Sequence, residues 1–142
     1  MASDPSAMPP ADEMEYDDAD LVGRLTPEEF RVLRRNGTER PFTSELNGET
    51  RQGNYHCKVC DTALFAHSAK FDSGCGWPSF DQEIEGARIT RIRDTSHGMI
   101  RVEIRCAECN SHLGHVFPDG PTETGTRHCV NGVCLTFRPE GD

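Results

Sequence analysis

Cysteine is the residue with the clearest chemistry in this sequence. Four of the seven cysteines form two C-x-x-C pairs, Cys57–Cys60 and Cys106–Cys109, which flank the segment 61–105. Two thiolates at this spacing chelate one metal ion from a tight turn, and two such turns complete a tetrahedral set of ligands. A closed four-thiolate site leaves no open coordination position. The spacing therefore predicts one structural Zn(2+) ion, with iron as the alternative metal.

Two other interpretations of the C-x-x-C pairs fit the sequence less well. A thioredoxin-like redox pair requires a βαβ context, which is absent here, and two disulfides require an oxidising compartment. His56, directly before the first pair, is an alternative metal ligand. Because four cysteines already make a complete set, we expect His56 in a supporting role.

The thiols left over are Cys75, Cys129 and Cys134. A free cysteine is most often a small buried apolar residue. Cys75 lies between two glycines, close to Trp77, the only tryptophan, so its loop can move and leave the sulfur accessible. Cys129 follows Arg127 and His128, which favour a thiolate. Two such thiols have the properties of a nucleophile and a resolving cysteine.

Two histidines, His112 and His115, follow the second C-x-x-C pair. A histidine near a metal site is more often a structural hydrogen-bonding group than a catalyst. These two lie three residues apart, beside Val116, Phe117 and the turn 118–120. In that position they can also line a pocket as proton donors.

A short helix precedes these groups. Thr26 can cap it, Pro27 suits its first position, and Glu29 can complete a capping box. The residues Phe30 and Leu33 then share one face, and the helix ends at 36–37 (Asn-Gly) after about ten residues.

Short β-runs punctuated by glycine and proline follow from residue 40 onward. Residues 98–105 alternate, with Ile100, Val102 and Ile104 on one face, which predicts a half-buried antiparallel strand. Its hairpin partner is 86–93, and the last strand runs from about Cys129 to Phe137. We therefore predict a mainly β fold, with two antiparallel sheets in a small barrel-like arrangement, a short N-terminal helix and the four-cysteine zinc site.

Charge is unevenly distributed along the chain. The net charge is −9, but residues 1–20 hold seven acidic and no basic residues, which leaves 17 acidic against 15 basic residues elsewhere. We expect a disordered acidic arm at 1–20 and one domain at 21–142. The near-neutral domain argues against nucleic-acid and membrane binding. Without a recognisable secretion signal or membrane span, a soluble cytoplasmic protein is expected.

Three sequence blocks carry a resemblance to a known family. Residues 70–80 (KFDSGCGWPSF), 112–121 (HLGHVFPDGP) and 127–131 (RHCVN) resemble the signature blocks of methionine-R-sulfoxide reductases of the B type. The similarity extends from about Thr26 to Phe137, with the C-x-x-C pairs in the expected order. It implies reduction of the R epimer of methionine sulfoxide, free or protein-bound, in repair of oxidative damage.

The resemblance also implies roles for the two reactive thiols. Cys129 attacks the sulfoxide sulfur and becomes a sulfenic acid, and Cys75 then condenses with it to a disulfide. Thioredoxin is the expected reductant of that disulfide. No bound organic cofactor is needed, and we expect a monomer.

The pocket residues follow from the same resemblance. His115 polarises the sulfoxide oxygen, and a polar network arranges it, formed by His112, Asp119 and Arg127. The indole of Trp77 forms an apolar wall for the S-methyl group. Asn131 helps to orient the substrate, because an extended strand points it to the same side as Cys129.

Two positions depart from the commonest family pattern. His128 stands where tyrosine or phenylalanine is frequent in the family, and we expect this difference to shift the pH optimum of the reaction. Cys134 could compete as a resolving thiol, but an offset of five residues along a strand places it on the face opposite Cys129. We therefore expect Cys134 to serve packing.

Two functions from other classes compete with the enzyme hypothesis. A zinc-stapled β-domain that only binds a ligand would need the four metal ligands, but not Cys75, Cys129 and the histidines as well. A nucleic-acid-binding zinc ribbon is disfavoured by the charge distribution.

Overall fold

The short helix that the sequence predicts after Thr26 begins at the expected residue. The computed structural model describes residues 18–84, 86 and 89–140, and in it helix α3 spans Pro27–Arg34. The Thr26 hydroxyl accepts a hydrogen bond from Glu29 N at 3.1 Å, and the Glu29 carboxylate accepts one from Thr26 N at 3.0 Å. These bonds form the predicted capping box. Leu33 is buried, as expected, and packs against the core.

A one-turn helix, α2 (Asp18–Leu21), precedes α3. Leu21 is fully buried, and Asp18 Oδ1 lies 2.8 Å from Arg34 Nε, so an ion pair joins the two helices. Residues 1–17 of the predicted acidic arm lie outside the described residues. Within the described ranges, no helix has the length and apolar character to cross a membrane.

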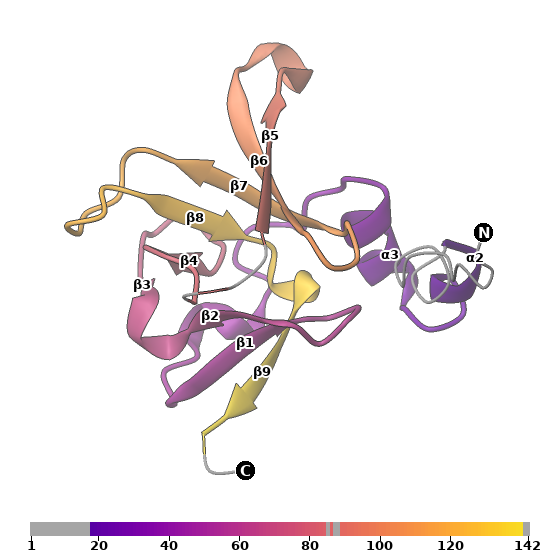
Figure 1. Ribbon diagram of the computed structural model, residues 1–142, viewed down its shortest axis with the longest axis horizontal. Coiled ribbons are helices and arrows are strands. Elements are labelled where there is room, and N and C mark those ends of the chain that lie inside the picture. Colours follow the sequence, from indigo (N-terminus) through magenta and orange to yellow (C-terminus); the bar gives the residue numbers. More distant parts are fainter. Residues whose placement is uncertain (1–17, 85, 87–88, 141–142) are drawn as a thin grey trace.

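The strands form two antiparallel sheets, which confirms the predicted mainly β class (Figure 1). The smaller sheet has the order β2-β1-β9, from Ala63–Ala66, Gly53–Cys57 and Leu135–Pro139. The larger has the order β3-β4-β8-β7-β6-β5, from Lys70–Phe71, Ser79–Phe80, Arg127–Val130, His112–Phe117, Arg101–Cys106 and Ile89–Asp94. Single 3-10 turns lie between strands at His67–Ala69, Ser96–Gly98 and Gly132–Cys134, and another lies between α3 and β1 at Glu45–Gly48.

Aromatic side chains form the core between the two sheets. Phe65 of β2 stacks on Phe80 of β4 with ring centroids 4.4 Å apart, and Tyr55 of β1 meets Phe80 edge-on at 5.0 Å. All three side chains are fully buried. Loss of one such ring costs about 3–5 kcal/mol of stability, so these contacts fix the smaller sheet against β4 and its neighbour β8.

The hairpin of β5 and β6 is paired as predicted, from Ile89 opposite Cys106 to Asp94 opposite Arg101. Its predicted buried face is wrong at the outer end. Ile104 is buried, but Ile100 is 73% exposed and Val102 also faces solvent. The hairpin projects beyond the rest of the larger sheet, so little packs against its tip (Figure 1).

The predicted continuous last strand is also wrong. β8 ends at Val130, a 3-10 turn follows at Gly132–Cys134, and β9 then pairs with β1 in the other sheet. The parity argument for Cys134 therefore does not apply. Its packing role rests instead on burial, because the Cys134 thiol is fully enclosed and contacts the His112 carbonyl oxygen at 3.2 Å.

Candidate metal centre and active site

The four cysteines of the C-x-x-C pairs converge on one point. Their sulfur atoms all lie within 4.8 Å of one another, with Cys57–Cys109 at 3.6 Å and Cys60–Cys106 at 3.5 Å. A tetrahedral zinc ion with Zn–S bonds near 2.3 Å separates its sulfur ligands by about 3.8 Å. The donor set and its spacing therefore fit a four-thiolate metal ion.

The two C-x-x-C turns share one pattern of backbone hydrogen bonds and dihedral angles. Asp61 N donates to Cys57 O at 2.9 Å, and Asn110 N donates to Cys106 O at 2.7 Å. Asp61 and Asn110 both have positive φ, 66° and 61°, a conformation that aspartate and asparagine tolerate better than most residues. Each turn thus contributes two sulfurs to the cluster.

The cluster joins three parts of the fold. Cys57 ends β1 in the smaller sheet, and Cys106 ends β6 in the larger. Arg34 of α3 donates from Nη1 to Cys109 O at 2.8 Å and to Ser111 Oγ at 3.0 Å. A metal ion bound here would therefore hold both sheets and α3 together.

A second pair of sulfurs lies at a separate place. Cys75 Sγ and Cys129 Sγ are 3.6 Å apart, near enough for a disulfide after a small movement of the loop. Cys129 lies in β8 directly opposite Ser79 of β4, and Ser79 Oγ is 3.5 Å from the Cys75 sulfur. The strand pairing therefore positions one thiol, and the loop that leads into β4 positions the other.

The two thiols have opposite pKa shifts. Burial, followed by the neighbouring Cys75 sulfur, raises the pKa of Cys129 to about 12, and the positive charge of Arg127 offsets this only in part. Burial also acts on Cys75, but hydrogen bonds with Ser73 and Ser79 lower its pKa below the ordinary value. Of the two thiols, Cys75 therefore ionises more readily than Cys129.

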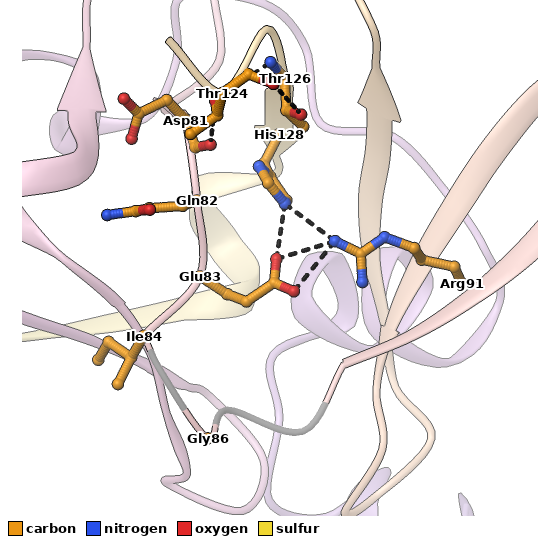
Figure 2. Close-up of a pocket in the computed structure, with 9 residues that line it drawn as sticks. All are labelled: Asp81, Gln82, Glu83, Ile84, Gly86, Arg91, Thr124, Thr126 and His128. Carbon is orange, nitrogen blue, oxygen red and sulfur yellow. Dashed lines mark hydrogen bonds and ion pairs between the residues drawn. The ribbon is translucent and has the colours of Figure 1, made fainter. Parts of the chain in front are cut away.

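His128 does not act on Cys129 as the sequence suggested. Neighbouring residues of a strand point to opposite faces, and His128 points away from Cys129 into a different cavity of about 350 Å³ (Figure 2). Its Nε2 lies 2.7 Å from the Glu83 carboxylate, which also accepts from Arg91 at 3.0 Å. His128 is thus part of a structural ion-pair cluster, and its ring packs on Phe65 in the core.

Cys129 borders a small cavity of about 90 Å³. His115 lies directly opposite Cys129 in the pairing of β7 with β8. At the adjacent Gly114, any Cβ atom would collide with the Cys129 carbonyl oxygen, so glycine permits this close strand approach. The lining residues are Thr38, Trp77, Arg101, Gly114, His115, Phe117, Cys129 and Asn131.

The polar network around the histidines differs from the expected one. His115 Nε2 pairs with Asp94 Oδ2 at 2.8 Å, and buried His112 Nδ1 pairs with Glu103 Oε2 at 2.7 Å. Burial lowers the pKa of His112, although Glu103 opposes this shift. The sequence analysis missed both carboxylates, which are brought in by the β5–β6 hairpin from positions distant in the chain.

Asp119 and Arg127 form a separate pair at the rim. Arg127 donates to both Asp119 carboxylate oxygens, at 2.9 and 3.2 Å, and its guanidinium lies 4.4 Å from the centre of the Phe117 ring. Their contact with the cavity is therefore through Phe117. Arg101, a lining residue that the sequence analysis also missed, has a buried Nε with no hydrogen-bond partner in the described part of the chain.

Glu39 is the most connected residue that the sequence analysis missed. Its buried carboxylate accepts hydrogen bonds from Gly132 N at 2.9 Å and Val133 N at 3.0 Å. Its backbone N donates to Asn131 Oδ1 at 2.9 Å, and its carbonyl accepts from Trp77 Nε1 at 3.0 Å. Asn131 also donates to Leu113 O. The amide of Asn131 is thus engaged in fixing the chain after Cys129.

Two facing thiols, one of them at a small cavity, and a separate four-cysteine cluster that could hold a metal ion define the class: a β-domain with the residues that thiol redox chemistry uses. Residues 25–139 match the SelR domain. The chain belongs to this family, the methionine-R-sulfoxide reductases of the B type, which confirms the predicted resemblance.

Named relatives show the same family. The chain is 60% identical over 115 residues to "Peptide methionine sulfoxide reductase MsrB" of Pseudomonas putida strain W619, which covers 81% of this chain and 86% of that protein. A protein of the same name from Agrobacterium fabrum strain C58 is 52% identical over 122 residues, covering 86% and 90% of the two chains.

Proposed function

We propose that this protein reduces the R epimer of methionine sulfoxide to methionine by thiol chemistry. The observation that carries the proposal is the 3.6 Å approach of Cys75 and Cys129 sulfurs at a cavity that His115 and Trp77 line. Family membership and the names of the relatives support the same reaction. A domain that only binds ligands would not require two facing thiols.

The first step transfers oxygen from substrate to enzyme. The Cys129 sulfur attacks the sulfoxide sulfur and forms an S–S bond, while the thiol proton passes to the sulfoxide oxygen. The hydroxyl then moves to the Cys129 sulfur as the S–O bond and the new S–S bond break, which releases methionine and leaves a sulfenic acid. The thiol proton and the oxygen both remain in the S–OH group, so the step is balanced. We propose that His115 relays this proton from the thiol to the oxygen, supported by its position opposite Cys129 and its contact with Asp94.

The second step restores the nucleophile. The Cys75 sulfur attacks Cys129, water leaves, and a disulfide forms. The lowered pKa of Cys75 favours its thiolate, the form that makes this attack. A dithiol reductant, which we propose to be thioredoxin, then reduces the disulfide.

We further propose that the four-cysteine cluster holds Zn(2+). Such an ion would supply cohesion and no chemistry at the substrate, because its four protein ligands close the coordination shell. We also propose that the protein acts as a monomer in the cytoplasm, where reduced thiols and thioredoxin are available.

An epimer-resolved assay tests the proposed function. The protein is mixed with racemic N-acetyl-methionine sulfoxide and dithiothreitol, and the loss of each sulfur epimer is followed. We expect loss of the R epimer alone, and none with Cys129→Ser. Unchanged R epimer with the wild type would refute the enzyme proposal, and activity retained by Cys129→Ser would refute this nucleophile.

Thiol counting under single turnover tests the resolving step. Without reductant, the wild type should lose two free thiols, whereas Cys75→Ser should lose one and keep a sulfenic acid. Cys134→Ser is the matched control, because Cys134 is buried and bonded to His112 O, and it should behave as the wild type.

A further inference from the structure

Phe42 has two costly properties at once. Its φ is 66°, in the left-handed region that a bulky L residue rarely adopts, and its side chain is 73% exposed. Because the ring is exposed, burial of its apolar surface contributes little to the stability of the fold. A glycine or asparagine would adopt this backbone conformation with less strain. Backbone strain of this kind is concentrated at functional sites, which makes the surface around Phe42 a candidate binding surface.

Contacts fix Phe42 to the loop that carries Cys75. Phe42 N donates to Gly76 O at 2.7 Å, and Asn47 Nδ2 donates to the same oxygen at 3.1 Å. The Phe42 ring lies so close to Gly76 that a Cβ there would be 3.1 Å from ring carbons. One side of the ring therefore packs on the loop that carries Cys75, and the other side is exposed to solvent.

A cavity of about 260 Å³ opens beside this ring. Its apolar lining comes from Phe42, Phe71, Trp77 and Pro78, and its polar lining includes Asn47 and Lys70. Asp72 and Ser73 also line it. These polar groups already have partners: Lys70 Nζ donates to Asn47 O, Asp72 Oδ1 accepts from Gly74 N, and Ser73 Oγ is 2.8 Å from Ser79 Oγ. The apolar side chains are therefore available to contact a ligand. Trp77 lines both this cavity and the catalytic cavity beside Cys129.

The sizes of the two cavities assign them different parts of a substrate. The catalytic cavity, about 90 Å³, has room for the end of one side chain only. A polypeptide that inserts its methionine sulfoxide there must keep its backbone outside, against the surface next to Trp77. The larger Phe42 cavity shares Trp77 with the catalytic cavity, and its aromatic and proline side chains can bury a neighbouring side chain of the substrate.

We propose that the Phe42 cavity binds an apolar side chain that flanks methionine sulfoxide in a polypeptide substrate. This inference rests on the proposed function and narrows it to protein-bound or peptide sulfoxide with an apolar neighbour. Phe42 then determines specificity without touching the reacting atoms.

The test compares two substrates with dithiothreitol as reductant. One is N-acetyl-methionine sulfoxide, and the other is a peptide with leucine on both sides of the sulfoxide. For Phe42→Ala we expect about a tenfold loss of kcat/KM with the peptide, carried mainly by KM, and no change with the single amino acid. Phe42→Tyr, which keeps the ring, should retain peptide activity. Ile100→Ala removes an equally exposed side chain that lines neither cavity, and should change neither activity.

Three results would overturn the inference. Equal losses with both substrates would show that Phe42 only supports the loop, and no loss with either would show that the cavity is not used. A loss seen only when thioredoxin replaces dithiothreitol would assign the surface to the reductant. Failure of the proposed function itself is distinct, because the wild type would then reduce neither substrate.

Discussion

Trp77 and Glu39 are joined by a hydrogen bond from the indole Nε1 to the Glu39 carbonyl oxygen at 3.0 Å. The carboxylate of the same glutamate binds the amides of Gly132 and Val133, just beyond Cys129. One buried residue therefore connects the indole wall of the catalytic cavity to the chain segment that follows the proposed nucleophile.

Replacing Glu39 with glutamine should disturb both sides of this connection. Glutamine offers one oxygen where two amides need acceptors, so one buried N–H would face another donor, at a cost of about 1–3 kcal/mol. We expect the free energy of unfolding to fall by that amount and kcat/KM to fall with it.

Tryptophan fluorescence separates a local effect of Glu39→Gln from general loosening. Trp77 is the only tryptophan, so its emission should shift in the folded variant. Glu123→Gln, at an exposed position, should alter neither stability nor emission. An unshifted emission together with full activity would show that the connection has no role in the site.

The pKa shifts of the two thiols predict which one reacts first with an alkylating agent. At neutral pH, Cys75 should be modified before Cys129, because its pKa is lowered and that of Cys129 is raised to about 12. In Cys75→Ser, the pKa of Cys129 should fall, since the Cys75 sulfur contributes to raising it. Thiolate absorbance and alkylation rate against pH measure both effects. Faster modification of Cys129 in the wild type would contradict the assignment.

Loss of the proposed metal ion should unfold the protein and not merely lower its turnover rate. Structural zinc contributes on the order of 10 kcal/mol of folding free energy in small domains, and the cluster here joins both sheets and α3. Cys57→Ser or treatment with a strong chelator should therefore lower Tm sharply and abolish activity together. Elemental analysis gives the metal and its amount per chain. A metal-free protein with unchanged Tm and activity would show that the ion is incidental.

The Glu83–His128–Arg91 cluster should affect stability but not catalysis. The hydrogen bond between Glu83 and His128, together with the contact with Arg91, lowers the pKa of Glu83 from 4.5 to about 2. A lowered carboxyl pKa stabilises the fold above the unfolded-state value and loses this effect as pH falls toward the folded-state value. Glu83→Gln should thus cost about 1–3 kcal/mol at pH 7, and the difference should shrink between roughly pH 4.5 and 2.

Denaturant unfolding of wild type and Glu83→Gln across that pH range measures the cluster's contribution. The difference between the two proteins removes the effect of other groups that titrate in both. Turnover at pH 7 should be unchanged, because Cys129 does not line this cavity and its side chain alternates with that of His128 along β8. A large loss of turnover in a well-folded variant would refute that separation.

Local patterns predicted the parts of the structure that neighbouring residues determine. The Thr26 capping box and the two C-x-x-C turns depend on residues three or four apart, and both appear as expected. The break after Val130 was missed because its cause is distant: Glu39 binds the amides of the 3-10 turn across more than ninety residues.

The site shows the same division. Motif blocks identified the residues around Cys75 and Cys129, which the structure brings together. The partners Asp94 and Glu103 were missed because each reaches its histidine through strand pairing of the β5–β6 hairpin with β7. Alternation predicted burial of Ile100 and Val102, but it does not reveal how far a hairpin extends beyond its sheet.

The order of the proposed metal ligands along the chain also matters during synthesis, which proceeds from the N-terminus. Cys109, the last of these ligands, leaves the ribosome before Cys129 and Cys134. At that point Cys75 is the only other cysteine outside the ribosome. A metal ion bound then would meet its four thiolates before the proposed nucleophile emerges, which favours the correct ligand set.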